Sequence, residues 1–254
     1  MKAITDYYEN YNEDMRLTRD NAHQVEYLTT THYFDQLIPA TSTILDVCAG
    51  TGIYSFYLAQ QGHMVTACDI SAHHVELIKS KPESDKLAEI AVSNVLDLSR
   101  FDDGAFDVVL CMGALYHLNN INDREKCLSE CLRVLKVGGL FVGAYINRHA
   151  VCIQSFLENL SDEVQERKEL AKTGVFNVFY GMDFKEINTL TNQFPLEKIV
   201  DIGIDGLAYP LSQWLNNLTS SEFEEYMGYH ISTCEQPSII GNSIHGLWIG
   251  RKSG

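Results

Sequence analysis

TILDVCAGTG, at residues 43–52, joins a short apolar run to a turn with two glycines, and an amphipathic segment, IYSFYLAQQG, follows at 53–62. This order predicts a strand, a tight turn and a helix. Such a unit brings backbone N–H groups and a helix N-terminus up to a ligand. Asp46 enters the turn as a carboxylate, and Asp69 ends the next apolar run, MVTACD. An acid at that place suits the ribose hydroxyls of an adenosine-containing cofactor.

The glycine spacing differs from that of nicotinamide-binding proteins. Their G-x-G-x-x-G fingerprint needs a third glycine three positions after Gly52, and this chain has Ser55 there. A nicotinamide-dependent oxidoreductase therefore remains only as a weaker alternative.

The segment DVCAGTG (46–52) resembles the first motif of the class I S-adenosylmethionine (SAM)-dependent methyltransferases, D/E-x-G-x-G-x-G. Asp46, Gly50 and Gly52 match that motif, and Cys48 replaces its first glycine. Three more stretches are similar to a group of bacterial small-molecule methyltransferases: YYENYNEDMRL (7–17), YHL (116–118) and IHGLWIGRK (244–252).

Strands and helices alternate along the first part of the chain, which predicts right-handed βαβ units and an open parallel sheet. Helices are expected at 21–38, 71–80 and 122–136, and strands at 64–69, 88–95, 105–112, 140–146, 196–204 and 243–251, besides the unit at 43–62. The resemblance implies an α/β fold with a Rossmann-like open seven-stranded sheet, mostly parallel, whose last strand is antiparallel, plus a helical lid insertion.

Four segments follow from this layout. We expect an N-terminal arm at 1–20, a SAM-binding Rossmann-like core at 21–146, a helical lid insertion at 147–193, and the C-terminal part of the sheet at 194–254 with a helical excursion at 211–235.

The resemblance implies a set of cofactor-binding residues at the carboxyl ends of the strands. The backbone around the glycine turn would face the methionine part of SAM, Asp69 the ribose, and the segment after the third strand the adenine. Cys111 ends the fourth strand, where backbone carbonyls would meet the cofactor's ammonium group. The predicted set is Asp46, Cys48, Ala49, Gly50, Gly52, Asp69, Ile70, Asn94, Val95, Leu96 and Cys111.

Each of three polar residues in that set has a structural alternative. Asp46 could serve only to form the turn, Asp69 could cap the following helix, and Asn94 could make a side-chain-to-backbone turn.

Tyr116 and His117 follow the fourth strand, where the transferable methyl group would point. We interpret His117 as a residue that orients or deprotonates the substrate and Tyr116 as a wall of the pocket. The alternative is that Tyr116 packs and His117 caps the loop. His245, at the start of the last strand, is a candidate for the substrate pocket or its lid.

The N-terminal arm is rich in aromatic residues, with Tyr7, Tyr8 and Tyr11 ahead of Arg16. We hypothesise that the arm closes over the cofactor, with its rings excluding water and Arg16 pairing with the cofactor carboxylate. An arm packed on the domain surface is the alternative.

Composition restricts the partners. The chain has 254 residues with 34 acidic and 19 basic side chains, a formal charge of −15, which argues against a nucleic acid or an anionic membrane as partner. Seven cysteines without a C-x-x-C pair favour buried thiols in a reducing, cytoplasmic setting. Cys127 and Cys131, four positions apart, do not by themselves make a metal site, and no metal is expected.

The sequence therefore predicts a SAM-dependent methyltransferase that acts on a small molecule by in-line displacement. A non-catalytic SAM-binding or regulatory protein is the alternative from another class. The oligomeric state and the accepting atom are not encoded in any motif that we find.

Overall fold

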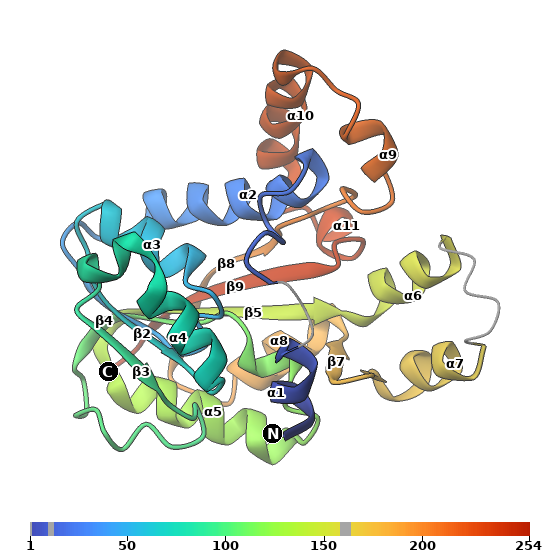
Figure 1. Ribbon diagram of the computed structural model, residues 1–254. Helices are drawn as coiled ribbons and strands as arrows, with labels where there is room; N and C mark the ends of the chain where they lie inside the picture. The colour runs from blue at the N-terminus through green and yellow to red at the C-terminus, as the bar shows by residue number, and fades with distance from the viewer. Residues whose placement is uncertain (1, 10–12, 158–163) are drawn as a thin grey trace.

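A computed structural model describes residues 2–9, 13–157 and 164–254, and it shows one mixed sheet with helices on both faces (Figure 1). Five parallel neighbours form one side of the sheet, in the spatial order β3 (Glu89–Val92), β2 (Met64–Asp69), β1 (Thr43–Asp46), β4 (Phe106–Cys111) and β5 (Leu135–Asn147). Beyond β5, the antiparallel strand β9 (His245–Lys252) lies between β5 and β8 (Leu196–Gly203). The predicted seven-stranded, mostly parallel sheet with an antiparallel last strand is thus confirmed.

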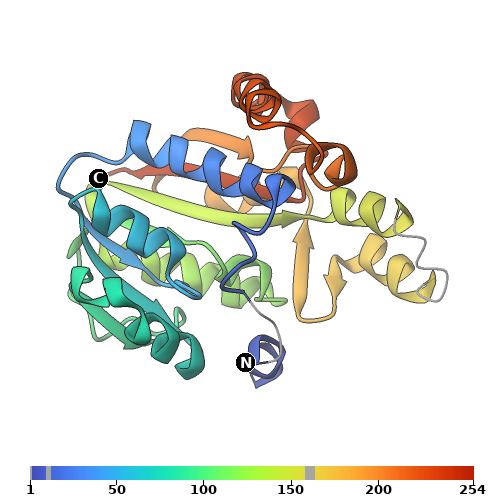
Figure 2. The same cartoon turned by 45° about the horizontal axis from the view of Figure 1, so that its top comes forward.

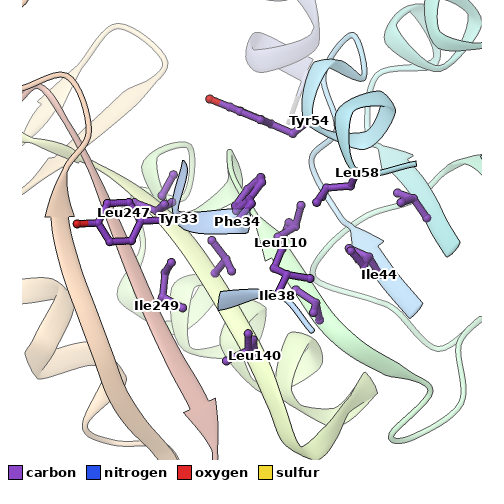
Figure 3. Close-up of a cluster of buried hydrophobic side chains, with 14 of the residues drawn as sticks. Tyr33, Phe34, Ile38, Ile44, Tyr54, Leu58, Leu110, Leu140, Leu247 and Ile249 are labelled. Carbon is purple, nitrogen blue, oxygen red and sulfur yellow. The ribbon is translucent and has the colours of Figure 1, made fainter. Parts of the chain in front are cut away.

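Two apolar clusters hold helices to the two faces. α2 (Asn21–Leu37) and α3 (Ile53–Gln60) pack on one face, where Phe34 and Leu58 meet Ile44 and Leu110 (Figure 3). α5 (Ile121–Val134) packs on the other, where neighbouring strand residues such as Leu45 and Val109 point. Because β1 and β4 are buried on both faces, apolar residues follow one another in each of them, as at Ile44–Leu45 and Val108–Cys111.

The other described helices and short 3₁₀ turns connect the strands or flank the sheet. They are α1 (Lys2–Glu9), α4 (Ala72–Ser80), η1 (Pro82–Lys86), η2 (Ala114–Tyr116), α6 (Arg148–Leu157), α7 (Val164–Thr173), α8 (Phe184–Thr191), α9 (Ser212–Leu215), α10 (Ser220–Thr233) and α11 (Pro237–Ile240).

The expected helix 122–136 is displaced toward the N-terminus. Asn120 is the N-cap, and its side chain accepts from the backbone N–H of Asn122 at 3.0 Å. The helix ends at Val134 because Leu135 is extended and enters the sheet. Gly138, with φ +81°, therefore lies within β5, where it provides a bend that other residues rarely adopt.

The segment 147–193 is only partly helical. Between α7 and α8 the chain forms a hairpin of β6 (Val175–Phe176) and β7 (Phe179–Met182), and Asn177 in its turn has φ +51°. β7 pairs in parallel with the end of β5, so the hairpin extends the sheet. The expectation of a helical lid insertion missed this hairpin because its strands are too short to show a periodic pattern. α6 and α7 project beyond the end of β5 (Figures 1 and 2).

The expected helical excursion consists of α9 and α10, with α11 after them. It rests on the start of α2 through Ala22, Val25, Leu215 and Phe223 (Figure 2). Among the described residues, we find no helix with the length and apolar character needed to cross a membrane.

Candidate active site

A cavity of about 130 Å³ opens at the carboxyl ends of β1, β2 and β4, where an open α/β sheet binds its ligand. Most of the predicted cofactor residues line it: Asp46, Cys48, Ala49, Gly50, Asp69, Ile70, Asn94, Val95 and Arg16, together with Tyr8, Tyr116 and His117. Gly52, Leu96 and Cys111 do not line it. We call this space the cofactor cavity.

The glycine turn needs both of its glycines. Gly50 has φ +55° and Gly52 has φ +88°, a backbone region that residues with a Cβ rarely adopt. A Cβ on Gly52 would also lie 2.8 Å from the ring of Phe56. Gly52 thus contributes by letting α3 start close to the turn.

Asp69 connects the turn to the next strand. One carboxylate oxygen accepts from Gly50 N at 2.9 Å and the other from Ser71 N at 2.8 Å. The helix-capping alternative does not apply to Asp69, because Ser71 is the N-cap of α4 and accepts from His74 N. Each carboxylate oxygen can accept a second hydrogen bond, so Asp69 can still bind ribose hydroxyls.

Asp46 is buried and lines the cofactor cavity. Its Oδ2 accepts from the hydroxyl of Ser55 at 2.7 Å, whereas Oδ1 has no hydrogen-bond partner of good geometry among the described residues. Burial raises the pKa of this carboxyl to about 7, and nearby Asp69 acts in the same direction. A buried oxygen without a donor fits a cationic N–H group such as the ammonium group of SAM.

Asn94 and Cys111 differ from the predicted picture. The side chain of Asn94 accepts from Leu96 N at 3.0 Å, which is the local turn named above as its alternative, although Asn94 also lines the cavity. The thiol of Cys111 points into the core, 3.7 Å from that of Cys127, and Cys131 completes a group of three fully buried thiols. Met112 and Gly113 line the cavity in place of Cys111.

The arm reaches the cofactor cavity through α1. The phenol of Tyr8 lies 2.9 Å from Nε2 of His117, and Nδ1 of His117 lies 3.0 Å from the carbonyl of Val178. Since a carbonyl only accepts, Nδ1 carries the proton and Nε2 accepts from Tyr8. Burial lowers the pKa of His117, so the imidazole is neutral near pH 7. Tyr11, also predicted in the arm, lies outside the described residues.

Tyr116 stands between two cavities. Its hydroxyl donates to the carbonyl of Met112 at 2.7 Å, and its ring lines both the cofactor cavity and a larger cavity of about 450 Å³. We call the latter the large cavity. Arm residue Tyr7 also lines the large cavity, as do residues of α6, α7 and the β6–β7 hairpin.

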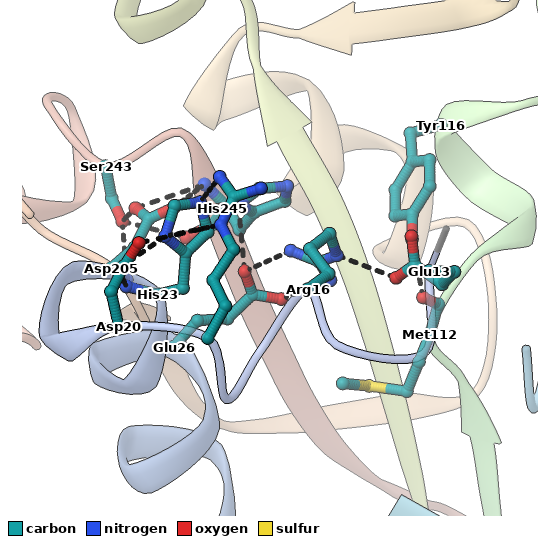
Figure 4. A network of polar contacts seen from close by, with 11 residues as sticks. Glu13, Arg16, Asp20, His23, Glu26, Met112, Tyr116, Asp205, Ser243 and His245 are labelled. Atoms are coloured by element: carbon teal, nitrogen blue, oxygen red, sulfur yellow. Dashed lines mark hydrogen bonds and ion pairs between the residues drawn. The ribbon is translucent and has the colours of Figure 1, made fainter. Parts of the chain in front are cut away.

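Arg16 has protein partners that the sequence did not predict (Figure 4). Its two terminal nitrogens donate to Glu26 at 2.7 and 2.9 Å, and Nε donates to Glu13 at 2.7 Å. Burial alone would raise the pKa of Glu26, but Arg16 and then His245 outweigh it and lower that pKa to about 2. The guanidinium is thus engaged by two carboxylates, in place of the cofactor carboxylate that we predicted.

His245 lines the large cavity and belongs to the same polar cluster. Its Nδ1 lies 2.7 Å from Asp205 and 3.4 Å from Glu26. Burial alone would lower the pKa of His245, but the two carboxylates outweigh it and raise that pKa.

Sequence reasoning missed several residues of the site. Ser55 was noted only as a missing glycine, and its hydroxyl holds Asp46. Glu26 lies in no motif, and Glu13 lies in the stretch YYENYNEDMRL without a role assigned to it. Phe176 and Phe179 reach the large cavity only because the hairpin turns there. Ser55 lies in the first turn of the helix that follows Asp46, and this position is a sequence signal for its hydrogen bond to Asp46.

Known proteins match both the domain and the fold. Residues 45–143 match the methyltransferase domain family. The chain is 39% identical over 103 residues to a demethylmenaquinone methyltransferase of Clavibacter sepedonicus, covering 41% of this chain and 40% of that protein. It is 33% identical over 114 residues to a ubiquinone biosynthesis O-methyltransferase of Xanthomonas axonopodis, covering 44% and 46%. The chain thus matches less than half the length of these two relatives.

Solved structures extend the similarity of fold to most of the chain. A SAM-dependent methyltransferase of Methanosarcina mazei superimposes with a TM-score of 0.59 at 20% identity, covering 87% of this chain and 97% of that one. Geranyl diphosphate C-methyltransferase of Streptomyces coelicolor, solved with S-adenosyl-L-homocysteine (SAH), superimposes at 0.60 with 17% identity, covering 91% and 80%. Residues 45–143 thus match a methyltransferase domain, and most of the chain has the fold of the SAM-dependent methyltransferases.

Proposed function

We propose that this protein transfers the methyl group of SAM to a small molecule held in the large cavity. The observation that carries the proposal is that the two cavities meet. Tyr8, Glu13, Arg16 and Tyr116 line both of them, so the two cavities adjoin at these four residues. A non-catalytic SAM-binding protein would not need this second cavity.

The residues of the cofactor cavity fit SAM. Asp69 would hold the ribose hydroxyls, the turn at 48–52 the methionine part, and the free oxygen of Asp46 the ammonium group. SAM supplies a methyl group already activated on a sulfonium. The protein's contribution is then mainly to align the acceptor and to exclude water.

His117 is suited to receive a proton from an acceptor that arrives protonated. Its Nε2 carries the lone pair, and in the structure that lone pair is taken by the hydroxyl of Tyr8. A substrate that displaces the Tyr8 hydroxyl would free Nε2 as a base. Tyr116 would shape the wall between the cavities.

Two further proposals concern the surroundings of the enzyme. All seven cysteines are free, and five of them are buried, which suits a reducing, cytoplasmic compartment. The charge of −15 disfavours nucleic acid as substrate or partner.

Calorimetric titration with SAM, SAH and NAD tests the cofactor assignment. We expect saturable binding of SAM and SAH and none of NAD. Asp69→Ala should weaken SAH binding by about tenfold or more, because the ribose hydroxyls lose a charged acceptor. Asp102→Ala, at an exposed carboxylate, is the matched control. Binding of NAD without SAM would overturn the proposal.

His117→Ala tests the proposed base. We expect SAH production from pooled small metabolites to fall about 100-fold, in the range of general-base contributions, with SAH affinity unchanged. His73→Ala, at an exposed histidine, should leave both unchanged. Full turnover in the His117 variant would show that His117 only supports the loop.

A further inference from the structure

Resting on the function proposed above, we propose that the methyl acceptor is an amine with an apolar, ring-sized body, and that Glu13 binds its ammonium group where the two cavities meet.

The position of Glu13 is the first argument. Among the described residues, Glu13 is the one carboxylate that lines both cavities, since Asp46 and Asp69 line the cofactor cavity alone. The accepting atom has to lie at the place where the cavities meet, because the methyl group comes from the cofactor side. A carboxylate there is in place to bind a cation on the acceptor.

The charges around Glu13 are the second argument. The cluster holds the carboxylates of Glu13, Glu26 and Asp205 and the cations Arg16 and His245 (Figure 4). Arg16 makes its two-pronged pair with Glu26, and His245 makes its shorter contact with Asp205. With His245 protonated, these five groups carry one net negative charge, which a bound ammonium group would balance. Asp20, in the same network, pairs with Arg19 and contacts His23.

Exposure assigns that surplus charge to Glu13. The side chain of Glu13 is 20% exposed, whereas that of Glu26 is 6% exposed and that of Asp205 is fully buried. Glu26 and Asp205 do not line either cavity. A ligand therefore meets the cluster through Glu13, and the carboxylates behind it hold Arg16 and His245 in place.

Aromatic rings surround the same place. Tyr8 and Tyr116 line both cavities, and the large cavity adds Tyr7, Tyr209, Phe176 and Phe179. Tyr7 and Phe179 meet edge to face at 5.4 Å, and Phe176 stacks on Phe179 at 5.4 Å. Such faces bury an apolar body and attract an ammonium group. Arg167 is among the residues that line the large cavity, but it does not line the cofactor cavity.

The reaction balances with Glu13 in this role. Glu13 holds the ammonium group, and one ammonium proton passes to Nε2 of His117, the base proposed above, and on to solvent, which leaves a lone pair on nitrogen. That lone pair forms the new N–C bond, and the C–S bond breaks with its electron pair remaining on sulfur. The products are the methylated amine, SAH and one released proton.

The test is a calorimetric comparison of two probes of equal shape, phenethylamine and phenethyl alcohol, with the free protein and with its SAH complex. We expect the amine to bind at least about tenfold more tightly than the alcohol. Glu13→Gln keeps an oxygen acceptor for Arg16 but removes the charge, so it should abolish that preference while SAH affinity stays within about threefold. Glu225→Gln, at an exposed helical position, is the control and should behave as the unmodified protein.

Three results of the probe titrations would overturn the assignment of Glu13. They are binding of neither probe, an amine that binds no better than the alcohol, and a preference that persists in Glu13→Gln. If Glu13→Gln loses SAM affinity but keeps SAH affinity, the assignment is overturned as well, because Glu13 would then bind the positively charged sulfonium of SAM. Failure of the proposed function is a different outcome, in which the unmodified protein binds neither SAM nor SAH.

Discussion

The contact between Ser55 and Asp46 determines the chemistry of the glycine turn. The hydroxyl of Ser55 donates to one oxygen of a buried carboxylate that lines the cofactor cavity, and the other oxygen has no hydrogen-bond partner of good geometry among the described residues. Glycine at position 55 could not supply that hydrogen bond. Ser55 thus stands where the nicotinamide fingerprint needs a glycine, and it also positions Asp46, the acidic residue of the methyltransferase-like motif.

Asp46 should make the stability of the free protein depend on pH. Its pKa rises from 3.8 to about 7 on folding, so the folded state holds the proton more tightly than the unfolded state. The carboxyl therefore costs stability as the pH rises from about 4 to about 7 and adds no further cost above that range. Relative to the unmodified protein, Asp46→Asn should gain about 1 kcal/mol of unfolding free energy per pH unit in that window.

Urea unfolding at several pH values within that window measures the difference between the two proteins. Asp102→Asn, at an exposed carboxylate, should show no such slope. A difference between Asp46→Asn and the unmodified protein that stays constant with pH would contradict the raised pKa.

At the scale of elements, α1 has a place over the site rather than in the core. None of its described residues belongs to the three apolar clusters, whereas Thr5 and Tyr8 line the cofactor cavity. Glu13 and Arg16, which follow α1, are held by α2 through Glu26. The arm is therefore attached to α2 at Arg16, and its helix α1 covers the site.

Removing residues 1–9 deletes α1 and keeps the attachment at Arg16, so it tests the role of the helix by itself. We expect SAH to bind about tenfold more weakly, because Thr5 and Tyr8 no longer cover the cavity. The thermal midpoint should change little, since the apolar clusters stay complete. Unchanged SAH affinity in a folded variant would show that the arm only packs on the surface.

At the scale of the whole molecule, the sheet brings distant segments to one edge. The ends of β1, β2 and β4 form the cofactor cavity, and the large cavity lies where the arm, the hairpin and His245 at the start of β9 meet. Because β9 runs antiparallel to β5, its first residue lies at the edge where β5 ends. That register brings His245 to the large cavity, which Arg16 of the arm also lines.

Much of the fold and the cofactor site could be predicted from the sequence alone. The glycine turn, Asp69 and the alternation of strands and helices are local features, since backbone conformation and burial on two faces leave a pattern in consecutive residues. The sequence by itself therefore determined the fold class and the cofactor.

Tertiary structure decided what lies around the acceptor. The pairing of Arg16 with Glu26, the place of Glu13, and the arrival of Phe179 from a short hairpin depend on contacts between segments far apart in the chain. Such contacts leave no periodicity, and a charged residue in a loop reads the same whether it is solvated or paired. Only the packed structure shows which charges pair with one another, and the proposed role of Glu13 rests on that pairing.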